Sequence, residues 1–82
     1  NLHEPRVKKD RTVDFSFNLF LPLKVRISLY DGKGRPQAVL VNKRIPDLGV
    51  QKMTFSARNL PRGLYYLIME ANGHRQYRYL LL

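Results

Sequence analysis

The chain has 82 residues, which suffices for one small domain and excludes a second. Hydrophobic residues make up 44% of it, with five Tyr and four Phe, and this favours a folded domain over a disordered segment. Fifteen Lys and Arg against six Asp and Glu give a net charge of +9, which predicts attraction to acidic partners. There is no Cys, so disulfides and thiolate metal sites are excluded.

Residues 1–11 are polar and charged, with Pro5 and a cluster of basic side chains. This composition predicts a linker or a short edge strand near Val7, leading into one domain over residues 12–82. The first residue is Asn and not Met, which suggests a processed or excised part of a longer protein.

Alternation of apolar and polar residues predicts an all-β chain. The expected strands span 12–19, 24–30, 38–44, 51–56, 64–71 and 74–82. The run 64–71 is apolar almost throughout, as expected for a central strand covered on both faces or for a strand at a sheet's crowded end. Turns are expected at 31–36, 46–49 and 60–63, and Asn72-Gly73 predicts a two-residue type I′ hairpin. Together these signals predict an immunoglobulin-like antiparallel β-sandwich of six to seven strands.

Catalytic chemistry is poorly provided for. His3 and His74 are isolated, without an orienting carboxylate nearby in the expected topology and without the spacing that brings metal ligands together. We therefore expect a protein that is not an enzyme and has no catalytic, cofactor or metal site. The turn Gly32–Arg35 is a weak phosphate-loop candidate, because Pro36 and a strand follow it instead of a helix.

Nucleic-acid binding has the necessary charge but no matching motif. The tyrosines at 65, 66, 77 and 79 are able in principle to stack on bases. Aromatic residues in strands usually pack within the protein, however, and no RNA-recognition or cold-shock motif can be matched. Nucleic acid is therefore not an expected partner.

Several turn residues have roles that follow from their chemistry. We expect Asp31 to accept hydrogen bonds from the amides of its own turn, and Gly34 to take a conformation that side chains resist. Arg35 is then free to fold back on the sheet or to meet an acceptor in a neighbouring loop. Pro61 and Gly63 set the turn that fixes the register of Tyr65.

The last strand, 77–82, is apolar to its end. A strand of this kind leaves an edge that is open to self-association, and it suits a signal that a receptor binds by strand addition.

Three segments, in this order, resemble the C-terminal sorting domain of the bacterial type IX secretion system: 25–35, 56–65 and 77–82. The family has a strand ending in Tyr-Asp, a Gly-Arg turn, a Leu-Pro-x-Gly-x-Tyr strand entry and a short apolar final strand. The resemblance covers about residues 12–82. It marks as recognition residues Asp31, Gly34, Arg35, Leu60, Pro61, Gly63, Tyr65, Tyr77, Arg78, Tyr79, Leu80, Leu81 and Leu82.

This resemblance implies an export signal. The outer-membrane translocon and its shuttle barrel would recognise the domain in the periplasm, and the attached cargo would reach the outer-membrane surface or the medium. In many members a sortase-like peptidase then removes the domain and joins the cargo to anionic lipopolysaccharide. Other members keep the domain as a docking module of the machinery.

The sequence departs from the family pattern in three ways. Pro36 follows Arg35, the usual Asp before the Leu-Pro turn is absent, and the surface is strongly basic. Residues 1–10 contain no Gly, Ala or Ser for an obvious cleavage site, which favours a retained domain. Two alternatives stay open: an immunoglobulin-like accessory domain of an extracellular enzyme or adhesin, similar to the flagellar hook-cap type, and a basic domain that binds anionic polysaccharide or nucleic acid.

Overall fold

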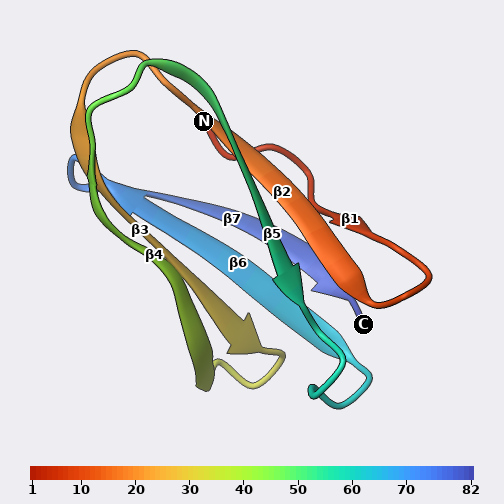
Figure 1. Cartoon of the computed structure of the whole chain (residues 1–82). Coiled ribbons are helices and arrows are strands. Elements are labelled where there is room, and N and C mark those ends of the chain that lie inside the picture. The colour runs from red at the N-terminus through yellow and green to blue at the C-terminus, as the bar shows by residue number, and fades with distance from the viewer.

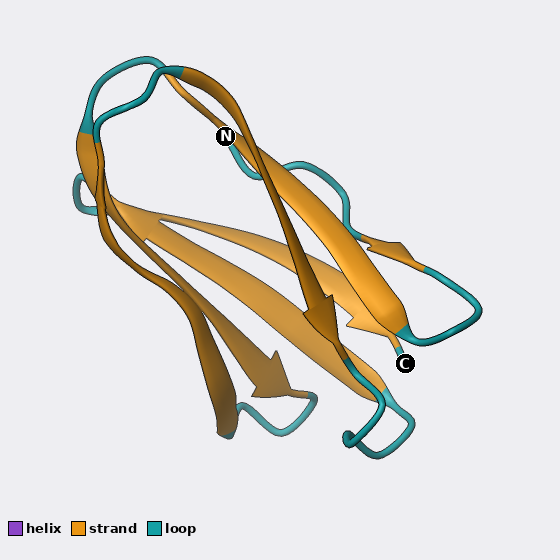
Figure 2. Ribbon diagram, in the orientation of Figure 1, coloured by secondary structure: helices purple, strands orange, loops and turns teal.

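The computed structural model describes residues 1–82 and is all-β, with seven strands in two antiparallel sheets (Figures 1 and 2). One sheet has the order β1-β2-β5 and the other the order β4-β3-β6-β7. The two sheets pack face to face as a β-sandwich, which confirms the predicted fold class. With no helix in the structure, no helical segment is present that could cross a membrane.

The three-stranded sheet is built on β2 (Thr12–Leu19), which pairs with β1 (Arg6–Val7) and β5 (Gly49–Ser56). Every second residue of β2 is buried, as its apolar–polar alternation predicted. Phe15 in β2 and Phe55 in β5 meet edge to face, with ring centroids 6.0 Å apart. This aromatic pair joins the inner faces of the two strands.

The four-stranded sheet consists of β4 (Pro36–Ile45), β3 (Leu23–Asp31), β6 (Leu64–Ala71) and β7 (His74–Leu81). In the constant-type immunoglobulin arrangement the fourth strand pairs with the fifth. Here β4 pairs with β3 instead, which places the fourth strand at the edge of the second sheet. β4 begins two residues earlier than expected because a proline is tolerated as the first residue of an edge strand.

One hydrophobic core lies between the sheets, and its buried residues come from five strands, from Leu2 before β1 and from Ala57 after β5. Its buried members are Leu2, Val13, Phe15, Phe17, Leu19, Val25, Ile27, Leu29, Val41, Ile45, Ala57, Tyr65, Leu67, Met69 and Leu80. Of the two expectations for 64–71, coverage on both faces is wrong. β6 is central in its sheet, but Tyr66 and Ile68 on its outer face are half-buried, since no third layer covers them.

The backbone has positive φ angles at turn positions where the sequence has Gly or Asn. Asn72 and Gly73 have φ values of 51° and 75°, so both residues of the β6–β7 turn adopt the positive φ that a type I′ hairpin requires. The prediction for this hairpin is confirmed. Gly34, in the β3–β4 turn, has a φ of 81°.

The segment before β1 packs on the sandwich. Asn1 and Asn18 exchange two backbone hydrogen bonds, of 2.8 and 2.9 Å, and Leu2 lies opposite Phe17 with its side chain fully buried. The register shifts by one residue before Arg6 pairs with Asp14. Such an irregularity fits a segment whose Pro5 cannot donate to the ladder. Of the two expectations for residues 1–11, the structure has the edge strand, and it adds a core residue that the sequence did not reveal.

Candidate functional site

The three segments that carry the family resemblance meet at one end of the sandwich. We call this the motif end, and it consists of Asp31–Arg35, Leu60–Tyr65 and Leu80–Leu82. Asp31 lies opposite Tyr65 in the β3–β6 ladder, and Tyr65 lies opposite Leu80 in the β6–β7 ladder. The backbones of Gly63 and Leu82 exchange two hydrogen bonds of 2.9 Å. Residues from three separate parts of the sequence therefore form one surface.

The two turns of the motif end share a depression of about 330 Å³. A Cβ placed on Gly32 would lie 3.2 Å from the carbonyl oxygen of Leu64, so a glycine lets the turns approach closely. Lys33 and Arg62 border the depression, and neither forms an ion pair. The depression is therefore lined by two cations that are available to an acidic partner.

The Asp31 carboxylate organises the β3–β4 turn. Its Oδ1 accepts 2.9 Å hydrogen bonds from the backbone N–H groups of Lys33 and Arg35, and its Oδ2 accepts a 2.8 Å bond from Arg35 Nε. The backbone bond from Arg35 is the main cause that lowers the pKa of Asp31, and the Arg35 side chain adds to it. Arg35 thus folds onto its own turn, a destination different from the sheet and the neighbouring loop that the sequence analysis left open.

We expect this turn to make stability depend on acid. Because the folded state lowers the pKa of Asp31, the charged carboxylate stabilises the fold above its ordinary pKa of about 3.9, and this stabilisation is lost as the pH falls through the lower folded value. Asp31→Asn should therefore melt at a lower temperature than the unsubstituted domain at pH 7, and the difference should shrink in strong acid. Thermal melts across the acid range measure this, with Asp47→Asn as control because Asp47 forms no ion pair. A difference that is constant with pH would contradict the assignment.

Tyr65 closes the corner between β5 and β6. Its ring is buried, and its Oη donates a 2.7 Å hydrogen bond to the carbonyl oxygen of Pro61. This geometry is the tyrosine corner of immunoglobulin-like sandwiches, in which a Tyr near the start of the sixth strand bonds the backbone a few residues upstream. Leu60 packs against the core, whereas Pro61 and Gly63 are exposed. Tyr65 and Leu60 therefore support the motif end from inside, and the turn itself is accessible.

β7 divides its side chains between the core and the outer surface. Tyr77, Tyr79 and Leu81 are 52%, 68% and 70% exposed, whereas Leu80 is 5% exposed. Leu82, just after the strand, packs against the core. A partner that meets the folded domain can therefore contact Tyr77, Tyr79 and Leu81, but not Leu80.

Arg78 connects β7 to the N-terminal segment. Its Nε lies 3.4 Å from Glu4 Oε1, an ion pair without hydrogen-bond geometry, and its Nη1 donates a 2.7 Å bond to the carbonyl of Tyr77. Nearby, the backbone N–H of Leu2 donates to Gln76 Oε1 at 2.6 Å. Arg78, a recognition residue in the sequence analysis, thus holds the first residues against the sheet.

The outer edge of β7 has no strand partner. Gly63 and Leu82 are a hydrogen-bonded pair, so the alternation of an antiparallel ladder directs the N–H and C=O groups of Tyr77, Tyr79 and Leu81 away from β6. The same three residues expose their side chains. The Tyr77 carbonyl already accepts the bond from Arg78 Nη1, and β1 lies next to β7. The backbone groups that this edge offers to an added strand are therefore those of Tyr79 and Leu81, beside the three exposed side chains.

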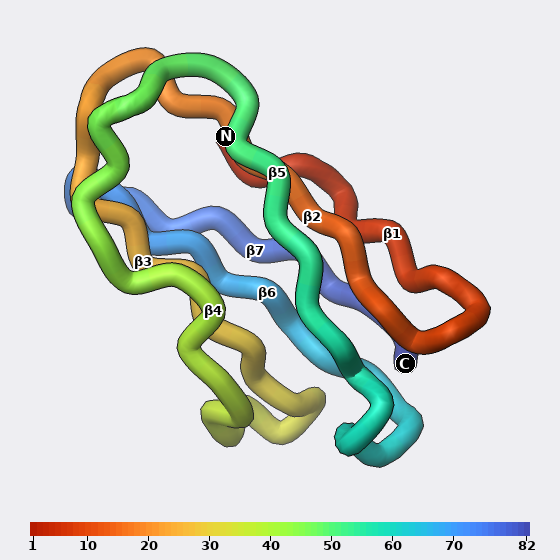
Figure 3. Tube along the Cα trace, in the orientation of Figure 1, coloured from red at the N-terminus to blue at the C-terminus, as the bar shows by residue number.

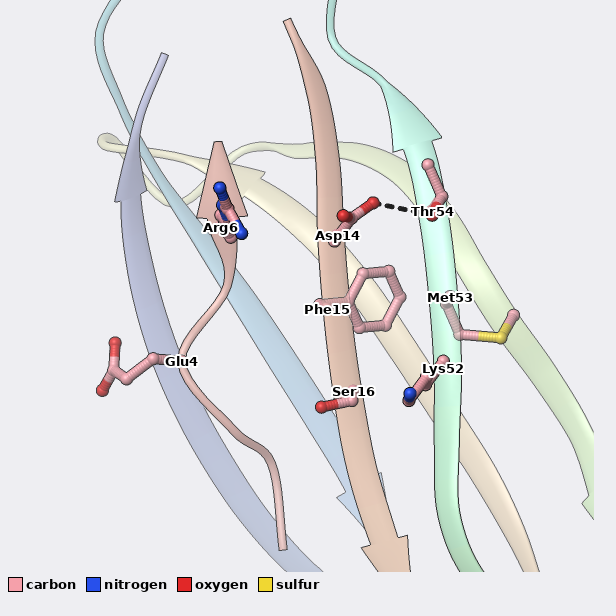
Figure 4. Close-up of a pocket in the computed structure, with 8 residues that line it drawn as sticks. All are labelled: Glu4, Arg6, Asp14, Phe15, Ser16, Lys52, Met53 and Thr54. Atoms are coloured by element: carbon pink, nitrogen blue, oxygen red, sulfur yellow. Dashed lines mark hydrogen bonds between the residues drawn. The ribbon is translucent and has the colours of Figure 1, made fainter. Parts of the chain in front are cut away.

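A polar depression of about 360 Å³ lies over β2 and β5 (Figure 4). Asp14 accepts a 2.8 Å hydrogen bond from Thr54 Oγ1, which is the main cause that lowers the pKa of Asp14, and Lys8 lies 3.4 Å away. At its side, His3 Nδ1 and Ser16 Oγ are 2.8 Å apart, a contact that the sequence analysis missed because 13 residues separate them. No carboxylate hydrogen-bonds to His3, so the pair lacks the third group of a nucleophile–base–acid arrangement.

The basic charge is largely unneutralised. Five cations form ion pairs, and the remaining ten of the fifteen have no acidic partner. A depression of about 500 Å³ on the four-stranded sheet is lined by Lys24, Arg26 and Arg75. Glu70, the one acid there, lies 3.6 Å from Arg75 and raises its pKa. Lys24 and Arg26 are left to bind an anion.

His74 also borders this depression. Nowhere do three His, Cys, Asp or Glu side chains gather in a group that could hold a metal ion. No protein-family model matches the chain, and a search of curated proteins finds no match either.

Proposed function

We propose that this domain is a sorting and docking module that the type IX secretion machinery recognises for export across the outer membrane. The observation that carries the proposal is the motif end. Segments 25–35, 56–65 and 77–82 are distant in the sequence, yet parts of all three meet around Asp31, Gly63 and Leu82. A receptor that binds residues of all three segments at once would need them to lie together at the motif end.

The edge of β7 supplies the mode of recognition. Tyr79 and Leu81 present outward backbone groups, and together with Tyr77 they present alternate side chains, which are the two elements that strand addition uses for affinity and for specificity. Recognition of this kind needs no unfolding of the sandwich, because the ladder between β6 and β7 stays intact. The receptor would be the translocon or its shuttle barrel, and the unpaired cations Lys33 and Arg62 would favour an acidic rim on it.

The test is a reporter with a cleavable signal peptide fused to residues 1–82, expressed in a bacterium that has type IX secretion. The whole chain is used because Leu2 belongs to the core. We expect surface or medium delivery of this fusion, and periplasmic retention when Tyr77, Tyr79 and Leu81 are all changed to Ser. These side chains are exposed, so the triple variant should stay folded, which protease resistance in the periplasm measures.

Two further variants sharpen the result. Val39→Ser removes an exposed apolar side chain from β4, at the edge of the four-stranded sheet opposite β7, and should leave export unchanged. Tyr79→Pro removes one outward N–H donor, whereas Tyr79→Ser keeps it, so strand addition predicts that Pro reduces export more than Ser. Export of the folded triple variant at the level of the Val39 control would overturn the proposal and favour an accessory immunoglobulin-like domain.

A further inference from the structure

The end of the sandwich opposite the motif end has an exposed apolar tip. It is formed by the β2–β3 and β4–β5 loops, which lie side by side (Figure 3). The apolar tip consists of Phe20, Leu21, Leu48 and Val50, which are 76%, 60%, 61% and 54% exposed. The ladder of β2 and β5 brings them together, since Leu19 pairs with Gly49 and Asn18 with Val50. Exposed apolar side chains gathered in this way mark a binding surface.

Basic side chains lie directly behind the tip. Lys24 pairs with Arg44 across β3 and β4, and Arg26 follows on the same face; all three are exposed and have no ion-pair partner. Asn72 and His74 line both the basic depression and a smaller one of about 240 Å³ that reaches Phe20 and Leu21. The basic depression is therefore adjacent to the tip. The only acid in the two loops is Asp47.

We propose that the apolar tip inserts into the interface of an anionic lipid bilayer while Lys24, Arg26 and Arg44 contact the headgroup phosphates. Charge complementarity and shape both favour a bilayer over a protein as the occupant. A stable protein interface buries about 800 Å² on each partner, usually on a broad face, whereas the tip is four side chains on two loops. Insertion of a few apolar side chains together with basic residues at the headgroup level is sufficient for reversible binding to a bilayer.

The test is sedimentation of the 82-residue domain with vesicles of phosphatidylcholine alone or with phosphatidylglycerol added. We expect binding only to the anionic vesicles. Phe20→Ser with Leu21→Ser should lower the partition coefficient by about tenfold or more, because two apolar side chains no longer leave water. Lys24→Gln with Arg44→Gln should lower it by about tenfold as well, and the binding should weaken with added salt.

A matched control keeps the test specific. Tyr79→Ser with Leu81→Ser removes two equally exposed apolar side chains at the opposite end, and it should leave vesicle binding unchanged. Melting temperatures of all three double variants should stay close to that of the unsubstituted domain, because the substituted residues are exposed. Equal binding to both kinds of vesicle, or undiminished binding of the Phe20/Leu21 variant, would overturn the proposal. So would self-association that depends on the tip without any vesicle binding.

Discussion

Leu2→Ala should lower the free energy of unfolding by about 2 to 5 kcal/mol, the range for a buried Leu whose removal leaves a cavity. The Leu2 side chain is fully buried and lies opposite Phe17, the largest fully buried residue of the core. A core of this size rarely supplies more than about 3 to 5 kcal/mol, so the variant should be partly unfolded at room temperature. Its Tm should fall by about 10 °C or more.

The matched control is Leu48→Ala, the same substitution at a side chain that is 61% exposed. Surface substitutions usually change stability by less than about 0.5 kcal/mol, so this variant should melt almost like the unsubstituted domain. Urea titration provides a second measurement, because a loss of stability moves the midpoint while the slope stays constant. Equal midpoints for the two variants would mean that the first residues do not belong to the cooperative unit.

The second large effect is expected at the glycines of two turns. Gly63 and Gly73 have φ values of 148° and 75°, which side chains resist, and a Cβ at either position would meet no atom within 4 Å. Gly63→Val and Gly73→Val should therefore each cost about 1 to 3 kcal/mol through backbone strain alone. Gly63→Val should also disturb the bonds to Leu82 and so loosen the motif end.

Arg62→Ala is the comparison, because Arg62 is exposed and has no ion-pair partner. Thermal melts of the three variants should place both glycine variants several degrees below Arg62→Ala, at about 4 to 8 °C for each kcal/mol. Three equal midpoints would contradict the turn geometry.

The strands could be predicted because their signals are local. The alternation Val13, Phe15, Phe17 produces one buried and one half-buried polar face, and Asn72-Gly73 specifies its hairpin within two residues. Whether both faces of β6 are covered was left open, since an apolar run does not tell whether a layer lies on its second face. That property depends on the number of layers, which no single segment encodes.

The candidate site was only partly predictable for the same reason. The turn chemistry of Asp31 and Gly34 follows from residues that are neighbours in the sequence. The meeting of that turn with Tyr65 and Leu80 depends on strand order, which the sequence pattern leaves open. Leu2 was missed because it is an isolated apolar residue in a charged segment that contains Pro5. Such a residue carries no periodic signal.

The two edges of the four-stranded sheet differ, and this limits what the domain can assemble into. The ladder of β7 with β6 is regular, whereas that of β4 with β3 shifts register twice, and Lys43 and Arg44 stand exposed on the β4 edge. Two copies that join through β7 form a two-fold symmetric pair and bury both regular edges. Growth into a fibril with a continuous sheet would need β4 to accept the next copy, and irregular pairing with two cations opposes that addition. Association through this sheet should therefore stop at the dimer.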